Sequence, residues 1–147
     1  MYKKGYTTGV FDLFHIGHLK ILEQAKSQCN QLIVGVTTDE CVFSYKNRYP
    51  IVPMEERIAI ISSLKCVDKV VPQETMDKIS AWESIKYDAL FHGDDWKGSS
   101  MYDDIKKKLS FRGVDLVFFK YTEHTSTTAL KKKIYQEELE LAKEKIK

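Results

Sequence analysis

The sequence contains few of the features that would place it outside the ordinary globular proteins. It has only three cysteines (Cys29, Cys41 and Cys66), an odd number without metal-ligand spacing, which predicts reduced and mostly structural thiols. No apolar run approaches the length of a membrane span, and the first residues, Met1–Gly5, contain no signal-peptide core. These absences lead us to expect a cytoplasmic protein.

The charge balance is also unremarkable. A formal net charge of +2 over 147 residues is too small to indicate nucleic acid or a membrane surface as a partner. One dense run of a single sign, Lys131–Lys133, falls in a predicted helix, where a solvated helix face explains it. No repeat, low-complexity tract or linker divides the chain, so we expect one domain over residues 1–147, with the end of the last helix protruding or frayed.

Short apolar runs alternate with helical patterns along the whole chain. Continuous runs such as Leu32–Val36 are typical of strands buried on both faces of a parallel sheet, and Thr37–Glu40 follows at the edge where ligands of such sheets bind. The pattern predicts a Rossmann-like, doubly wound parallel α/β sheet of about five strands, with helices on both faces. The other strands are expected near Tyr6–Phe11, Lys69–Val71 (closed by Pro72), Asp88–His92 and Asp115–Phe119.

One segment departs from this regularity. Residues Cys41–Pro53 contain two prolines and the cations Lys46 and Arg48, and they predict an exposed loop beside the first helix. Pro53 stands where the next helix could start.

The most informative stretch is Thr8–His18, which predicts a strand end, a tight turn and the first turn of a helix. His15 and His18 are three residues apart and therefore neighbours on one helix face, at an N-terminus whose free N–H groups attract phosphate. Gly9 and Gly17 would let a ligand approach the backbone closely. Two histidines that merely cap the helix are the alternative, but the presence of Gly9, Phe11, Asp12 and Gly17 around them favours a phosphate site.

Two further segments predict ligand contacts. Gly93–Gly98 follows the fourth predicted strand and contains two glycines, two carboxylates and an indole, which indicate a ligand loop or a metal-binding carboxylate pair. Ser126 or Thr127 is the expected N-cap of the last helix. This hydroxyl-rich helix start either contacts phosphate or only caps the helix, and the residues alone do not decide between the two.

Together these pieces resemble the glycerol-3-phosphate cytidylyltransferase group of the nucleotidyltransferases that carry a His-x-Gly-His motif. The resemblance rests on Gly9–His18, Lys46 with Glu56-Arg57, Gly93–Trp96, and Thr122–Thr128, and it covers roughly Gly5–Ile134. It implies an enzyme that joins CTP to a small phosphate ester, giving a CDP-linked product and pyrophosphate, with Mg²⁺ and typically as a homodimer. Precursors of a surface polysaccharide or polymer are the expected products.

The resemblance also implies roles for individual residues. His15, His18 and Lys46 would be catalytic, while candidate metal ligands are Asp12 and Asp94. The residues expected to bind nucleotide or phosphate are Thr8, Gly9, Val10, Phe11, Gly17, Arg57, Gly93, Asp94, Asp95, Trp96, Thr122, Ser126 and Thr127.

Two departures from the group's pattern lie in its last motif, where Tyr121 replaces an arginine and His124 replaces a glycine. They leave the acceptor open between glycerol-3-phosphate, phosphocholine, phosphoethanolamine and related small phosphate esters. The alternatives are an adenylyltransferase of the same superfamily and a non-catalytic nucleotide-binding module.

Overall fold

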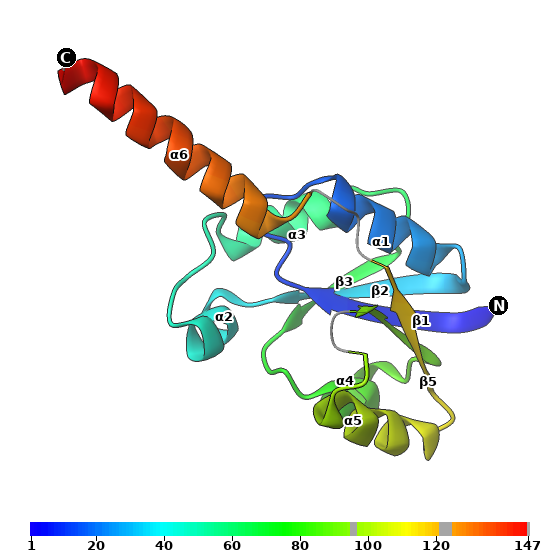
Figure 1. The fold of residues 1–147 in the computed structure, drawn as a ribbon. Helices are drawn as coiled ribbons and strands as arrows, with labels where there is room; N and C mark the ends of the chain where they lie inside the picture. Colours follow the sequence, from blue (N-terminus) through cyan, green and yellow to red (C-terminus); the bar gives the residue numbers. More distant parts are fainter. Residues whose placement is uncertain (95–96, 121–124, 147) are drawn as a thin grey trace.

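The computed structural model describes residues 1–94, 97–120 and 125–146, and its centre is a parallel sheet of five strands (Figure 1). The strands are ordered β3-β2-β1-β4-β5, and helices cover both faces of the sheet. The Rossmann-like, doubly wound fold is therefore confirmed. The strands are β1 (Tyr2–Gly9), β2 (Cys29–Thr37), β3 (Lys69–Gln73), β4 (Ala89–Gly93) and β5 (Asp115–Phe119). The helices are α1 (Ile16–Lys26), α2 (Asp39–Lys46), α3 (Met54–Ser62), α4 (Lys78–Ile85), α5 (Ser100–Ser110) and α6 (Thr127–Ile146).

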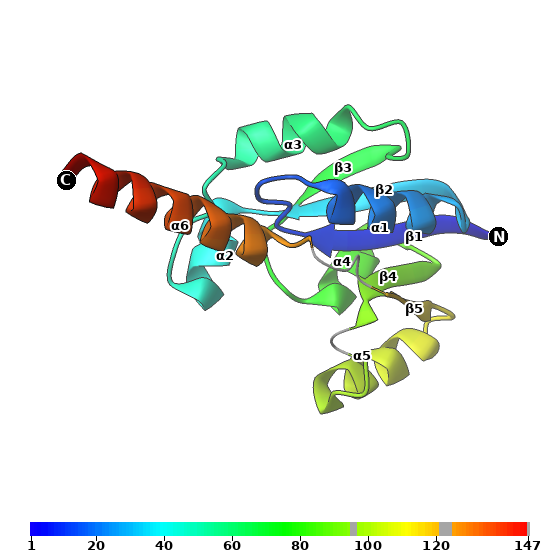
Figure 2. The same cartoon turned by 45° about the horizontal axis from the view of Figure 1, so that its top comes forward.

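Each face of the sheet has its own hydrophobic core. On one face α1 and α3 pack against the strands through Leu22, Ala25 and Ile61. On the other face α4 and α5 do so through Trp82 and Leu109. Figure 2 shows the sheet between these two pairs of helices. Because the central strands are covered on both sides, their sequences are continuously apolar rather than alternating.

The winding of the chain reverses at the central strand. β1 pairs with β2 on one side and with β4 on the other, and these strands end at Thr37 and Gly93 close to the end of β1 at Gly9. Ligands of open α/β sheets bind outside the carboxyl ends of the strands at such a reversal. The fold thus places the end of β1, with the histidine motif that follows it, at the expected binding point.

The expectation of an irregular loop over Cys41–Pro53 is wrong for its first half, because α2 extends to Lys46. Oγ1 of Thr38 accepts the backbone N–H of Cys41 at 3.0 Å and caps the helix, whose first turn is acidic. Buried Cys41 and Val42 fix one face of α2 to the body. The irregular segment therefore begins only at Asn47, whose φ of 56° ends the helix.

Strand β3 does not end before Pro72 as expected, but continues through it to Gln73. β3 lies at the edge of the sheet and pairs only with β2, so one side of its backbone has no strand to bond. An edge strand tolerates proline, because on its outer side there is no neighbouring strand that needs the missing N–H as a donor.

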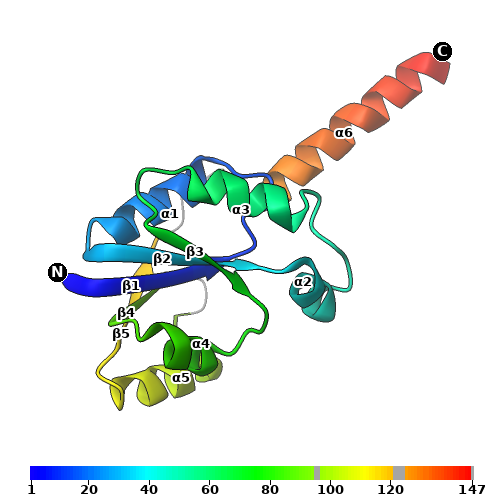
Figure 3. The same ribbon diagram turned by 180° about the vertical axis from the view of Figure 1, so that it is seen from behind.

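Helix α6 extends away from the rest of the molecule (Figures 1 and 3), and none of its residues is buried. Oγ of Ser126 accepts the N–H of Ala129 at 3.0 Å, so Ser126 is the N-cap. At the base of the helix, Oγ1 of Thr127 donates to the backbone carbonyl of Asp12 at 2.8 Å. No helix in the described part of the chain is both long enough and apolar enough to cross a membrane.

Candidate active site

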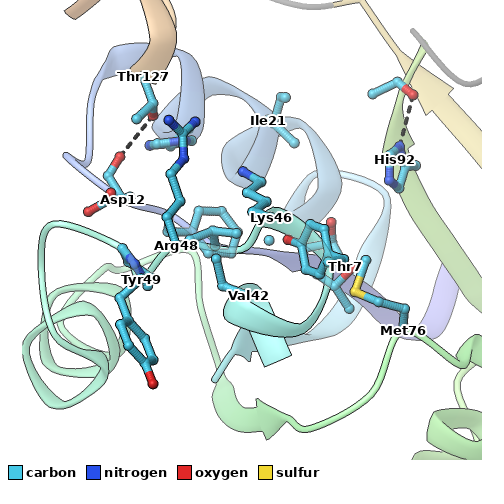
Figure 4. Close-up of a pocket in the computed structure, with 18 of the residues that line it drawn as sticks. Thr7, Asp12, Ile21, Val42, Lys46, Arg48, Tyr49, Met76, His92 and Thr127 are labelled. Carbon is cyan, nitrogen blue, oxygen red and sulfur yellow. Dashed lines mark hydrogen bonds between the residues drawn. The ribbon is translucent and has the colours of Figure 1, made fainter. Parts of the chain in front are cut away.

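A cavity of about 380 Å³ opens at the carboxyl ends of β1 and β4 (Figure 4). Its volume is within the range of small-molecule sites. Thr127 and Asp12 lie at one end of the close-up, whereas Met76 and His92 lie at the other. The wall is formed by residues 7–12, by His18 and Ile21 of α1, by residues 42, 45, 46 and 48–50, and by Met76, His92, Gly93, Thr127 and Lys131.

His15 and His18 form a reciprocal cap at the start of α1. Nδ1 of His15 accepts the backbone N–H of Gly17 at 3.1 Å, and Nδ1 of His18 accepts the backbone N–H of His15 at 3.3 Å. This is a capping box built from two histidines. Capping and phosphate binding are therefore compatible, because the cap occupies only one nitrogen of each ring.

The cap also determines the protonation of the two rings. A neutral imidazole has one N–H, so a ring that accepts through Nδ1 carries its proton on Nε2. Burial lowers the pKa of His15, and burial followed by the neighbouring His15 lowers the pKa of His18 to about 4. Both rings are therefore neutral at physiological pH, and each has its Nε2–H as a donor.

The two glycines of the motif make room for neighbouring side chains. A Cβ on Gly17 would lie 2.9 Å from Cε1 of His15, and a Cβ on Gly9 would lie 2.9 Å from the ring of Phe11. The expectation that both glycines expose backbone to a ligand is thus not supported for Gly17, which is buried beneath the His15 ring. Gly9 does line the cavity, as do Thr8, Val10 and Phe11.

Asp12 joins three segments of the chain at the end of the cavity near α6. Its carboxylate accepts the backbone N–H groups of Ile51 and Val52, both at 2.9 Å, and its carbonyl accepts the hydroxyl of Thr127. Burial opposes ionisation of Asp12, but the two N–H groups and the charges of Lys131 and Arg57 together outweigh it and lower the pKa. Asp12 is only 4% exposed, so the structure gives it the role of a junction rather than an open metal ligand.

Positive charge dominates the cavity wall. Lys46, Arg48 and Lys131 line it, and Asp12 is the only carboxylate among the described lining residues. The pKa of Lys46 is lowered by partial burial and then by the nearby charges of Lys131 and Arg48. Such a group of like charges is stabilised by a polyanion, and a nucleoside triphosphate is one.

A further cation lies behind the wall and was not predicted from the sequence. Nζ of Lys78 donates to Oγ1 of Thr8 at 2.6 Å, and the Lys78 side chain is buried. Burial lowers its pKa to about 8. Nothing in the sequence around Lys78 distinguishes it from a solvated lysine at a helix start, whereas the structure places its charge directly behind the cavity.

His92 was likewise missed. Its Nδ1 lies 3.0 Å from the carbonyl of Gly93, and its Nε2 lies 2.9 Å from the hydroxyl of Tyr102. Within the sequence, the only signal was a polar residue one position before the glycine that ends a buried strand. Gly93 itself lines the cavity, as predicted.

Arg57 does not have the role expected for it. It is 1% exposed, and its guanidinium donates to the carbonyls of Val10 and Thr37, both at 2.8 Å, to the carbonyl of Val52 at 2.9 Å, and to the Asp39 carboxylate. Because these partners accept hydrogen bonds from the guanidinium, the charged group can be buried. The structure therefore assigns Arg57 to holding the strand ends together, and it is not part of the cavity wall.

The remaining predicted residues have mixed outcomes. Asp94 is partly exposed and is not part of the described wall, and Ser126 is exposed and caps α6. No group of three or more histidine, cysteine or acidic side chains that could hold a metal ion occurs among residues 1–94, 97–120 and 125–146. Asp95, Trp96 and Thr122, together with the two departures at Tyr121 and His124, lie outside the described residues.

Comparison with known proteins places this site in context. Residues 6–133 match the family model described as cytidylyltransferase-like. The glycerol-3-phosphate cytidylyltransferase of Bacillus spizizenii is 37% identical over 131 residues, which are 88% of this chain and 95% of the relative. The protein of the same name from Staphylococcus aureus is 31% identical over 134 residues, covering 90% and 96% of the two chains.

A solved structure gives the same result at the level of the fold. The crystal structure of a lipopolysaccharide core biosynthesis protein from Thermoplasma volcanium superimposes with a TM-score of 0.69 and 26% sequence identity. The superposition covers 85% of this chain and all of the other.

Proposed function

The chain belongs to the cytidylyltransferase-like family, and from this premise we propose that it joins CTP to a small phosphate ester, giving a CDP-linked product and pyrophosphate. Glycerol-3-phosphate is the acceptor that the names of the relatives suggest, and a precursor of a surface polysaccharide or polymer is the product this implies. An adenylyltransferase is not favoured. The observation that carries the proposal is the cavity at the end of β1, where His18 and three cations face one saturated carboxylate.

The reaction follows from the charges of the site. The phosphate of the acceptor is already ionised at neutral pH, so its oxygen can attack the α-phosphorus of CTP in line without a general base. Catalysis then depends on positioning and on stabilising charge at the phosphorus and on the departing pyrophosphate. Donors that are fixed before the substrate binds are effective at this task, because they need not reorganise during the reaction.

His18, which lines the cavity, is such a fixed donor, and His15, which is not among the described lining residues, is expected to be a second. Their Nδ1 atoms are engaged in the helix cap, which orients both rings and keeps the proton on Nε2. A neutral donor makes no strong ion pair before the reaction. Its hydrogen bonds to the phosphates can therefore strengthen as negative charge develops on them. Lys46, at the end of α2 and on the cavity wall, supplies a point charge to the reacting phosphates.

Mg²⁺ is expected from the resemblance, and the described residues suggest how it would be held. Both carboxylate oxygens of Asp12 already accept backbone N–H groups, and Asp94 does not line the cavity. Mg²⁺ commonly binds through substrate phosphates and water with few protein ligands. The phosphates of CTP would therefore be its main ligands, and the ion would supply positive charge to them.

We also propose that the protein is a homodimer, which the resemblance alone suggests. Its test is the mass of the protein in solution, measured by light scattering during size-exclusion chromatography. A mass of about 17 kDa at micromolar concentration would contradict it, since a single chain has 17.1 kDa.

The proposed reaction is tested by pyrophosphate release. Each nucleoside triphosphate is supplied with Mg²⁺ and a panel of small phosphate esters, and release is expected with CTP and at least one ester. In parallel, CTP should raise the melting temperature more than ATP or GTP, because a ligand that binds only the native state stabilises it. Equal shifts for CTP and ATP would contradict the assignment of cytidine and leave the fold unaffected.

A further inference from the structure

The outer part of α6 projects from the molecule beyond the segment that matches the family. The match ends at residue 133, whereas α6 continues to Ile146 and extends away from the sheet (Figures 1 and 3). Thr127 and Lys131 attach the base of the helix to Asp12, and no described residue of α6 is buried. A helical segment as short as residues 134–146 is marginal in water unless something packs on it.

One face of this projecting segment carries an apolar stripe with the spacing of a coiled coil. Its members follow one another at intervals of four, three and four positions, and all are exposed: Tyr135, Leu139, Ala142 and Ile146. The other side of the helix is not continuous in this way, because the positions between Ile134 and Leu141 that would extend it are Glu137 and Glu138. The stripe is therefore the face that a partner would cover.

The charges of the segment indicate what the partner is. Glu137, Glu138 and Glu140 form an acidic block, and Lys143 and Lys145 follow in the last turns. A second copy of the helix, packed antiparallel on the stripe, brings the acidic block of each copy beside the basic residues of the other. A parallel copy would instead bring like blocks to the same level. The order of the charges thus favours an antiparallel second copy.

The stripe also sets the register of such a pair. Leu139 lies opposite the partner's Ala142, so a large side chain meets a small one at the centre. On one flank Glu138 faces the partner's Lys145, and the two-fold symmetry repeats this ion pair. At a rise of 1.5 Å per residue, the bases of the two helices are roughly 30 Å apart along the pair. The two bodies therefore lie at opposite ends and do not collide.

We propose that residues 135–146 of α6 form an antiparallel two-helix interface with a second copy of this chain. The interface contains no residue of the cavity wall, whose last member along the chain is Lys131. It depends neither on the proposed reaction nor on the segment shared with the family, so it stands or fails separately from both.

The first test compares the same substitution on the two sides of the helix. Leu139 and Leu141 are 40% and 50% exposed, and two positions along a helix place them on opposite sides. Light scattering during size-exclusion chromatography, from micromolar to millimolar protein, measures the mass. Leu139→Gln should weaken self-association by roughly 100-fold, because each pair loses two buried leucines. Leu141→Gln should associate like the wild type.

The second test determines the orientation by reversing charges. Glu138→Lys should weaken association a few-fold at low salt, and adding Lys145→Glu should restore it, because the two residues face each other only in the antiparallel pair. If a further surface also pairs the chain, the wild type is a tetramer and Leu139→Gln a dimer, so the mass is halved in either case.

Three outcomes would overturn the proposal. The first is a wild type that remains a single chain of 17.1 kDa at millimolar concentration. The second is an equal mass for Leu139→Gln and Leu141→Gln. The third is restoration of Glu138→Lys by Lys143→Glu instead of Lys145→Glu, which would show that the helices pair in parallel.

Discussion

The imidazole rings of His15 and His18 stack with their centroids 3.8 Å apart, in the geometry of a helix cap. Close stacking disfavours a positive charge on both rings at once, and the pKa values of both are lowered. The pair is thus a cap and a set of neutral donors at the same time. Substitutions that separate these two tasks can be designed from the geometry.

His18→Gln is the substitution that preserves the cap. Glutamine at the third helical position can accept the N–H of His15, so the melting temperature should stay close to that of the wild type. The Nε2–H of His18 is lost, and kcat should fall by roughly 10²–10³-fold, the scale for one lost transition-state donor. CTP affinity should fall much less. His18→Ala should lose both activity and the cap, and turnover within a few-fold of the wild type in either variant would make the pair purely structural.

The lowered pKa of His18 also predicts how stability depends on pH. The unfolded chain binds a proton at His18 near pH 6.5, whereas the folded protein does so only near pH 4. Between these values the unfolded state binds more protons, so the free energy of unfolding decreases as pH falls from about 6.5 to about 4. Denaturant unfolding of the wild type and of His18→Gln across this range measures the effect. A parallel pH dependence in the two proteins would show that His18 is already solvated in the native state.

The strands and the histidine motif could be predicted because their signals are local. Continuous apolar runs identify strands buried on both faces, and the spacing of His15 and His18 is set by helix geometry alone. The start of α6 at Ser126 follows from capping preferences in the same way. The end of β3 and the helix α2 were missed because an edge position and a buried helix face, respectively, outweighed the local signals of Pro72 and of the prolines and cations in Cys41–Pro53.

The roles of individual cations could not be predicted, because burial decides them. Arg57 looks like a phosphate-binding residue in the sequence, yet carbonyls from three separate segments enclose it. Lys78 and Lys131 look like solvated lysines, yet one is buried behind the cavity and the other lines it. Each outcome depends on contacts between residues far apart in the chain, which no window of sequence contains.

Lys46→Ala should lower kcat severely while leaving the melting temperature of the unliganded protein almost unchanged. The side chain is exposed and makes only a distant cation–π contact with the Tyr45 ring, 5.8 Å from its centroid, so it contributes little to folding. In a closed site filled with phosphates its charge acts at a lower effective dielectric. Lys20→Ala, at an exposed position of α1, is the matched control and should retain wild-type turnover. Normal turnover of Lys46→Ala would remove Lys46 from the mechanism.

Lys78→Met should raise the melting temperature at pH 7. The buried ammonium donates to a hydroxyl, and it has no hydrogen-bonded carboxylate partner among the described contacts, so its charge is costly to bury. Since the folded pKa is about 8 and the ordinary value is 10.5, this cost is complete below pH 8 and disappears as pH rises toward 10.5. The stabilisation by Lys78→Met should therefore shrink over that interval in melting curves. A variant less stable than the wild type at pH 7 would indicate that the amine is better solvated than its burial suggests.

The burial of Arg57 has a consequence for how the enzyme acquires its activity as it folds. Its guanidinium joins the ends of β1 and β2 to the residues just before α3, and its partners Thr37 and Val10 lie 20 and 47 positions away from it in the chain. Local helices need no long loop to close, so contacts of this range are expected to form after them. A chain whose helices have formed but whose Arg57 has not reached its partners would have no competent site. Recovery of catalytic turnover during refolding should accordingly lag behind recovery of secondary structure.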